Sequence, residues 1–144
     1  MVGCGFDNNS FQRLGDVDGP TESWWKGLDG TRLFSHWMRA SYCVLFSAPG
    51  NLHEFEKFVD VRLPELLKNA TTPHVLAVSG ADLTPVQPHV SRLFAAYNAK
   101  HADDPEKPHF VISTPTRYFE AIRGYEFPEE EGDRNPVFQG CYSA

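Results

Sequence analysis

The chain has 144 residues, enough for one domain with its own hydrophobic core and too few for two ordinary domains. Its 41% hydrophobic and 22% charged residues argue against wholesale disorder, and no apolar run approaches the roughly 18 residues that a membrane-spanning helix needs. The net charge of −6 comes from the two ends, because residues 31–125 carry 10 Lys and Arg against 9 Asp and Glu, and this neutral body argues against a nucleic-acid partner.

Residues 1–30 alternate turn-forming Gly, Asp and Asn with two adjacent tryptophans, which predicts an extended N-terminal arm with aromatic anchors. Trp24 and Trp25 either fold back onto the domain or become buried in a partner protein, so they are candidate interface residues. Between Thr31 and Arg39, apolar residues at helical spacing behind a possible Thr31 cap predict a short helix.

The middle of the chain predicts alternating strands and helices. Buried strands are expected at residues 41–47, 74–79 and 109–113, because these runs are short, apolar and bounded by turn-forming residues. An amphipathic helix is expected to begin after Asn51, which can cap it, and to be bent or divided at Pro64, which removes one backbone hydrogen bond.

The second half contains one ambiguous segment and a charged end. Residues 89–97 fit both the spacing of a helix and the alternation of a strand, so periodicity leaves their structure open. A helix is expected over residues 116–123, preceded by a capping Thr and a Pro. Residues 126–144 predict an acidic, extended tail. Its acidic run is either solvated or a candidate interface for a basic partner, and it consists of Glu129, Glu130 and Glu131.

Motifs that carry chemistry are missing from the sequence. Cys4, Cys43 and Cys141 are too widely spaced for a disulfide framework or a zinc site, so we expect free thiols, with one disulfide left open. The six histidines lack metal-ligand spacing, and no phosphate-binding loop or nucleophile elbow occurs. Asp82, at the end of an expected strand, fits either a catalytic carboxylate or a turn residue, and the turn is favoured. We therefore expect no catalytic residue, cofactor or metal.

Several short elements together resemble a known family. They are the turn Ser47-Ala48-Pro49-Gly50, a helix with Phe58 and a terminal Asn69, and Val86-Gln87-Pro88 followed by Arg92, Phe94 and Tyr97. This pattern is similar to the thioredoxin-like accessory subunit of mitochondrial respiratory complex I, whose domain two mitochondrial ribosomal proteins share. The resemblance implies an α/β, thioredoxin-like domain over residues 31–125, with a central mixed sheet of about four strands, two main helices, and a strand at residues 89–97.

The resemblance also implies a function. The protein would be a non-catalytic structural subunit on the matrix-facing peripheral arm of complex I, supporting its assembly or stability. It would contact other subunits, without nucleic acid, a membrane span or a small-molecule substrate. Cys43 is at most a doubtful redox residue, because it lies inside the first expected strand instead of at its end.

Two other classes of protein fit parts of the sequence. A mitochondrial ribosomal protein with the same domain would be expected to present Lys and Arg clusters to RNA, which the neutral body does not offer. The first part of a glycosyltransferase-like enzyme is similar at Leu63-Pro64-Glu65-Leu66, His74-Val75-Leu76 and Gly80-Ala81-Asp82, but would need a further nucleotide-binding domain. The prediction from sequence is therefore a structural protein and not an enzyme.

Overall fold

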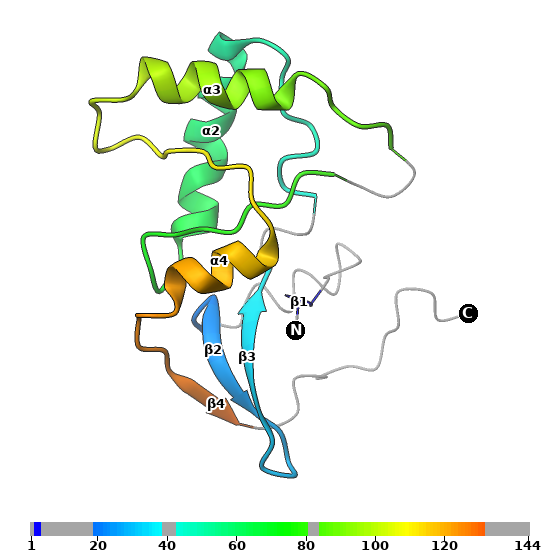
Figure 1. Cartoon of the computed structure of the whole chain (residues 1–144), viewed down its shortest axis with the longest axis vertical. Helices are drawn as coiled ribbons and strands as arrows, with labels where there is room; N and C mark the ends of the chain where they lie inside the picture. The colour runs from blue at the N-terminus through cyan, green and yellow to red at the C-terminus, as the bar shows by residue number, and fades with distance from the viewer. Residues whose placement is uncertain (1, 4–18, 39–42, 81–83, 132–144) are drawn as a thin grey trace.

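The computed structural model describes residues 2–3, 19–38, 43–80 and 84–131. Within these ranges the chain forms one mixed sheet and three helices (Figure 1). The elements are β1 (Val2–Gly3), β2 (Glu22–Lys26), β3 (Arg32–Trp37), α2 (Leu52–Leu67), α3 (Val90–Lys100), α4 (Pro115–Ile122) and β4 (Glu129–Glu131). Helices α2 and α3 lie at one end of the molecule, and β2, β3 and β4 lie at the other, with α4 between them. No helix in the described ranges is long and apolar enough to cross a bilayer.

The sheet is built around a hairpin. Strands β2 and β3 are antiparallel, with Trp24 opposite Phe34, whereas β1 and β4 add to the two outer edges as parallel neighbours. The hairpin loop is closed by Asp29, whose carboxylate accepts hydrogen bonds from the Thr31 N–H at 2.9 Å and the Thr31 hydroxyl at 3.0 Å. Gly30 takes a positive φ of 82°, which a residue with a Cβ rarely adopts.

The helix expected between Thr31 and Arg39 is wrong, because this stretch forms strand β3. Its apolar residues satisfy a helical spacing, but the hairpin offers the backbone a complete ladder to β2 and cross-strand side-chain contacts. The Trp24 and Phe34 rings, for example, meet edge to face at 5.2 Å. Strand β2 lies within residues 1–30, where the sequence predicted an extended arm.

The other two predicted helices, after Asn51 and over residues 116–123, are confirmed with corrected details. Asn51 caps α2 by accepting a hydrogen bond from the Glu54 N–H at 3.0 Å, and the helix continues through Pro64 to Leu67 without being divided. The ambiguous segment at residues 89–97 belongs to helix α3, so the strand that the family resemblance implied there is wrong. Thr114 caps α4, with a proline at the first turn as expected.

The main hydrophobic core lies between α2, α3 and the turns at residues 43–48. Phe55 of α2 and Tyr97 of α3 have no exposed surface, and their rings meet edge to face at 5.6 Å. Phe110 packs against both of these rings, at 5.3 and 5.1 Å. The remaining buried members are Val44, Leu45, Ala48, Val59, Leu93 and Phe94. This core brings the segment that contains Phe110 against the two helices.

The three segments expected as buried strands form no strand in the described residues. Residues 43–47 are turns, and residues 74–79 and 109–113 have no regular structure, although the Leu45 N–H donates to the Val78 carbonyl at 3.1 Å. A short apolar run becomes a strand only where a neighbouring strand pairs with its backbone groups. The coarse class, a small α/β unit with a mixed sheet, is confirmed; its strands are not those of the predicted thioredoxin-like arrangement.

Candidate functional site

A buried polar cluster joins the sheet to α4 and to the loop after α2. Glu22 is 1% exposed, and its Oε1 accepts hydrogen bonds from His36 Nδ1 at 2.9 Å and from the Tyr118 hydroxyl at 2.5 Å. Its Oε2 accepts from the Thr71 hydroxyl at 2.5 Å and from the Thr71 N–H at 3.3 Å. An ionised carboxylate only accepts, so His36 must carry its proton on Nδ1.

The hydrogen bonds decide the protonation of this cluster. Burial by itself would raise the pKa of Glu22, but the hydrogen bonds from His36, Thr71 and Tyr118 together outweigh it and lower that pKa to about 2. Burial and the hydrogen bond to Glu22 both raise the pKa of Tyr118. Glu22 is therefore a carboxylate and Tyr118 a neutral donor at neutral pH, which keeps the cluster fully hydrogen-bonded.

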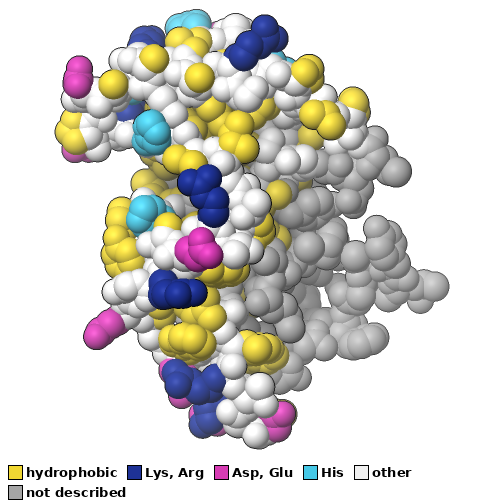
Figure 2. Space-filling model, viewed as in Figure 1, with side chains coloured by type: hydrophobic (Ala, Val, Ile, Leu, Met, Phe, Trp, Pro, Cys, Tyr) yellow, Lys and Arg dark blue, Asp and Glu magenta, His cyan; other side chains and the backbone are white. Residues whose placement is uncertain are grey.

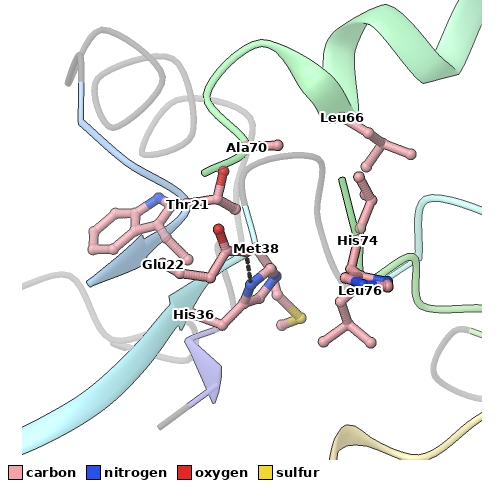
Figure 3. A pocket seen from close by; sticks show the side chains of 10 residues that line it. Thr21, Glu22, His36, Met38, Leu66, Ala70, His74 and Leu76 are labelled. Atoms are coloured by element: carbon pink, nitrogen blue, oxygen red, sulfur yellow. Dashed lines mark hydrogen bonds and ion pairs between the residues drawn. The ribbon is translucent and has the colours of Figure 1, made fainter. Parts of the chain in front are cut away.

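The cavity beside this cluster is small. Figure 3 shows Glu22 and His36 on one side of it, with Leu66, His74 and Leu76 on the other. Its volume of ≈ 20 Å³ has room for one or two water molecules and for nothing larger. The cluster therefore holds structural elements together and does not form a substrate site.

A larger, open groove of ≈ 440 Å³ lies on the α2–α3 side of the molecule. Phe46, Ser79 and Ile112 line it, and each stands near the carboxyl end of one of the three segments that the sequence predicted as strands. Small-molecule sites are concave and combine apolar surface with a few polar groups. The size and the mixed lining of the groove therefore make it the candidate site.

Side-chain hydrogen bonds hold the segments around the groove. Asn98 of α3 bonds both backbone groups of Phe110, with each donor–acceptor distance at 2.8 Å, and so replaces the strand neighbour that this segment lacks. The chain turns at Gly80, in the groove wall, with a positive φ of 141° that favours glycine. Thr84, Gln87 and Ser91 add polar groups to the wall.

The candidate interface residues make contacts within the chain. Trp24 is 38% exposed, with the Arg32 guanidinium 5.2 Å from the centre of its ring, and Trp25 is half-buried. The acidic run forms β4, where Glu129 pairs with Arg32 at 2.8 Å, Glu130 accepts from Ser23 at 2.8 Å, and Glu131 pairs with Lys26 at 3.2 Å. The partner subunits expected at these residues stay a prediction.

The remaining sequence candidates contribute no described site. Cys43 is half-buried in a turn, and its doubtful redox role is not tested. Cys4, Cys141 and Asp82 lie outside the described residues. The described parts of the chain contain no group of three or more His, Cys, Asp or Glu that could hold a metal ion. On the face shown in Figure 2, acidic and basic side chains are interspersed with apolar ones.

Ser79, Thr84 and Ser91 stand in no catalytic or binding motif of the sequence, and Gln87 belongs only to the tripeptide that carries the family resemblance. The available signal was positional: Ser79 ends an expected strand, Gly80 follows it, and a Pro-rich loop without helical pattern comes directly after them. In α/β units, such loops carry functional residues.

The structure is a small α/β unit with an open groove, and the comparisons identify its family. Residues 4–140 match the model of the glycosyl hydrolases family 38 N-terminal domain, and the chain belongs to this family. Among solved structures, it is similar to an alpha-mannosidase from Enterococcus faecalis V583, with a TM-score of 0.66 and 25% sequence identity. The similarity covers 76% of this chain and 12% of the mannosidase chain. No curated protein matches.

These findings correct the function predicted from sequence. The complex I subunit, its mitochondrial matrix location and the non-enzyme class are wrong, because the family is one of glycosyl hydrolases. The alternative of a mitochondrial ribosomal protein is wrong for the same reason, the match to a glycosyl hydrolase family. The glycosyltransferase-like alternative is nearer, since it named a carbohydrate enzyme, although the family hydrolyses and does not transfer. Turns such as Ser47-Ala48-Pro49-Gly50 occur in many α/β folds, so they do not identify a family.

Proposed function

We propose that this chain forms part of a domain that hydrolyses α-mannosides, and that the open groove receives the sugar. The observation that supports this most is the family match over residues 4–140, together with the similarity to an alpha-mannosidase. The chain spans only 12% of that enzyme, so it supplies one section of the active site and other parts of the domain supply the rest.

The chemistry of the groove suits a sugar ring. Its volume of ≈ 440 Å³ lies within the usual range of small-molecule sites. The hydroxyls of Ser79, Thr84 and Ser91 can exchange hydrogen bonds with sugar hydroxyls, because each group is both a donor and an acceptor. Phe46 and Val86 add apolar surface for the C–H faces of the ring.

Glycoside hydrolysis commonly uses a pair of carboxylates on either side of the scissile bond. The described residues that line the groove include no carboxylate. Asp82 lies in the sequence between Gly80 and Thr84, both of which line the groove. Asp82 is therefore our candidate for one carboxylate of the pair, in place of the turn residue that the sequence favoured. The second carboxylate would have to come from residues other than those that line the groove in the described structure.

The test is hydrolysis by the purified protein that carries this chain. We expect release of p-nitrophenol from p-nitrophenyl α-D-mannopyranoside and much slower release from the β-anomer, because the two anomers place the scissile bond on different faces of the ring. Hydrolysis of both anomers at one rate, or of neither, would contradict the proposal. A circular dichroism spectrum of the same sample establishes that the protein tested is folded.

A further inference from the structure

Gln87 holds the loop after residue 84 against the carboxyl end of the segment at residues 43–48. Its Nε2 donates to the Phe46 carbonyl, and two residues later His89 Nε2 lies 3.4 Å from the Ala48 carbonyl. The Gln87 carbonyl accepts from the Val90 N–H at 3.3 Å, just where α3 begins. The tripeptide Val86-Gln87-Pro88, all three residues of which line the groove, therefore fixes the groove wall relative to the helix.

The other end of the Gln87 carboxamide has no partner. Its Oε1 is a buried acceptor for which the described structure offers no hydrogen-bond donor. Exchanging oxygen and nitrogen would not remove the problem, since it would place an oxygen against the Phe46 carbonyl. A buried acceptor without a donor is costly, and such groups are rare in native proteins, so this one needs an explanation.

We propose that Gln87 Oε1 accepts a hydrogen bond from one hydroxyl group of the sugar bound in the groove, and that this bond helps to select the substrate. The inference rests on the proposed function, because it needs a sugar in the groove. For this bond to form, the wall must move slightly and expose Oε1 while Nε2 stays bonded to Phe46, and the neighbouring Val86, which is 89% exposed, lies on the uncovered side of the wall.

This arrangement makes a specific demand on the ligand. The Gln87 amide nitrogen is engaged by Phe46, so Gln87 offers the ligand an acceptor and no free donor pointing the same way. A sugar that lacks the matching hydroxyl would leave Oε1 buried and unpaired, and sites built to bind a hydroxyl discriminate strongly against analogues without it. Gln87 is thus a specificity-determining residue distinct from the carboxylates that break the bond.

The decisive test combines Gln87→Met with a series of aryl α-mannosides, each lacking one ring hydroxyl. Removing a hydroxyl also changes the intrinsic reactivity of the substrate, which its uncatalysed hydrolysis measures. For the wild-type protein, we expect the kcat/KM of one deoxy substrate to fall about tenfold further than this change in reactivity explains. Gln87→Met keeps the side-chain length and removes the acceptor. The excess loss should then disappear, because neither the parent nor the deoxy substrate can form a hydrogen bond with residue 87. An unchanged ratio for every deoxy substrate would overturn the inference.

The matched control is His89→Ala, which removes the neighbouring tether to Ala48 and leaves the Gln87 acceptor in place. Loosening the wall lowers kcat/KM for all substrates by one common factor, so His89→Ala should keep the wild-type discrimination between parent and deoxy substrate. Loss of that discrimination in His89→Ala would show that wall rigidity, and not the Gln87 acceptor, selects the substrate. Circular dichroism of both variants checks that each is folded.

A binding measurement separates failure of this inference from failure of the proposed function. In a titration with methyl α-D-mannopyranoside, we expect the side-chain amide resonances of Gln87 in a ¹⁵N-correlated spectrum to shift together with those of the backbone around the groove. Shifts around the groove that leave the Gln87 side chain unmoved would overturn the inference while the proposed function stands. No shift anywhere, together with no hydrolysis of α-mannosides, would overturn both.

Discussion

Glu22 couples the stability of the fold to acidic pH. Its pKa of about 2 in the folded protein lies below the ordinary value of 4.5, so its contribution to stability is fully present above pH 4.5 and is lost as the pH falls towards 2. The groups that face its carboxylate are His36 of β3, Tyr118 of α4 and Thr71 of the loop. The shift corresponds to about 3 kcal/mol. We expect Glu22→Gln to remove this part of the pH dependence, as measured by urea unfolding at pH 5 and pH 2.5.

Other carboxylates with lowered pKa values, such as Glu54 and Glu56, stay in both proteins, so the difference between the two pH profiles isolates Glu22. Glu54→Gln is the matched control, because Glu54 pairs with Lys57 in solvent on α2 and such pairs contribute little. Parallel profiles for wild type and Glu22→Gln would mean that the buried cluster is not ionised as the hydrogen bonds require.

Asp82 is the residue on which hydrolysis itself is expected to depend. Replacing it by asparagine keeps its size and removes its charge, and loss of a reacting group typically lowers kcat by roughly a thousandfold or more. We expect this loss for Asp82→Asn in the p-nitrophenyl α-mannoside assay. Asp103→Asn, in the exposed loop after α3, should keep wild-type kcat. If Asp82→Asn retains activity, Asp82 is not a catalytic carboxylate, and the interpretation as a turn residue, which the sequence favoured, holds instead.

At the scale of elements, helix α2 packs into the core through one face, and its aromatic residues differ in how much they stabilise the protein. Phe55 is fully buried between Phe58, Phe94 and Tyr97, so Phe55→Ala should destabilise the protein by about 3–5 kcal/mol. Phe58 packs at the edge of this cluster and is only half-buried, so Phe58→Ala should cost less. Val61, which is 72% exposed, should tolerate Ala with little change. Equal losses in urea unfolding for the three variants would contradict this ranking.

Local signals predicted the helices, and non-local pairing explains what the sequence missed. The capping residues Asn51 and Thr114 and the apolar stripes lie within a few positions of each other, so α2 and α4 were predictable. Strand β3 depends on β2 across a Gly-containing loop, and β4 pairs with β2 from about 100 residues away along the chain. Such pairings leave only a weak pattern in a single sequence, which periodicity cannot distinguish from a helix in a run as short as Arg32–Trp37.

In the candidate site, too, local sequence patterns reveal some residues, and contacts between distant parts of the chain decide the rest. Ser79 and Gly80 were visible as the end of an apolar run, but nothing local shows that Phe46, Gln87 and Ile112 meet them around one groove. The buried Glu22–His36–Tyr118 cluster was equally hidden, because its members are up to 96 residues apart. Short motifs such as Val86-Gln87-Pro88 fitted an unrelated family, whereas a match over residues 4–140 identifies the right one.

At the scale of the whole molecule, the exposed apolar residues around the groove predict a surface that interacts with other polypeptide. Val86, Val111 and Ile112 are 89%, 58% and 61% exposed. Val111 and Ile112 are neighbours in a segment without regular structure, so two adjacent apolar side chains are exposed there. Exposed apolar patches of this kind mark interaction surfaces.

The chain on its own should therefore bind an apolar fluorescent dye at the groove, and Ile112→Lys should lower the dye fluorescence by roughly half, because a charge then lies in the middle of the patch. Val61→Lys introduces the same charge at an exposed valine of α2 that is not among the groove residues, so it should leave the fluorescence nearly unchanged. In a longer protein that covers the patch, Ile112→Lys should instead destabilise the fold, since it would place a charge in an apolar interface. Equal dye binding by the chain, Ile112→Lys and Val61→Lys would show that the patch around Ile112 is not the apolar surface that recruits a neighbour.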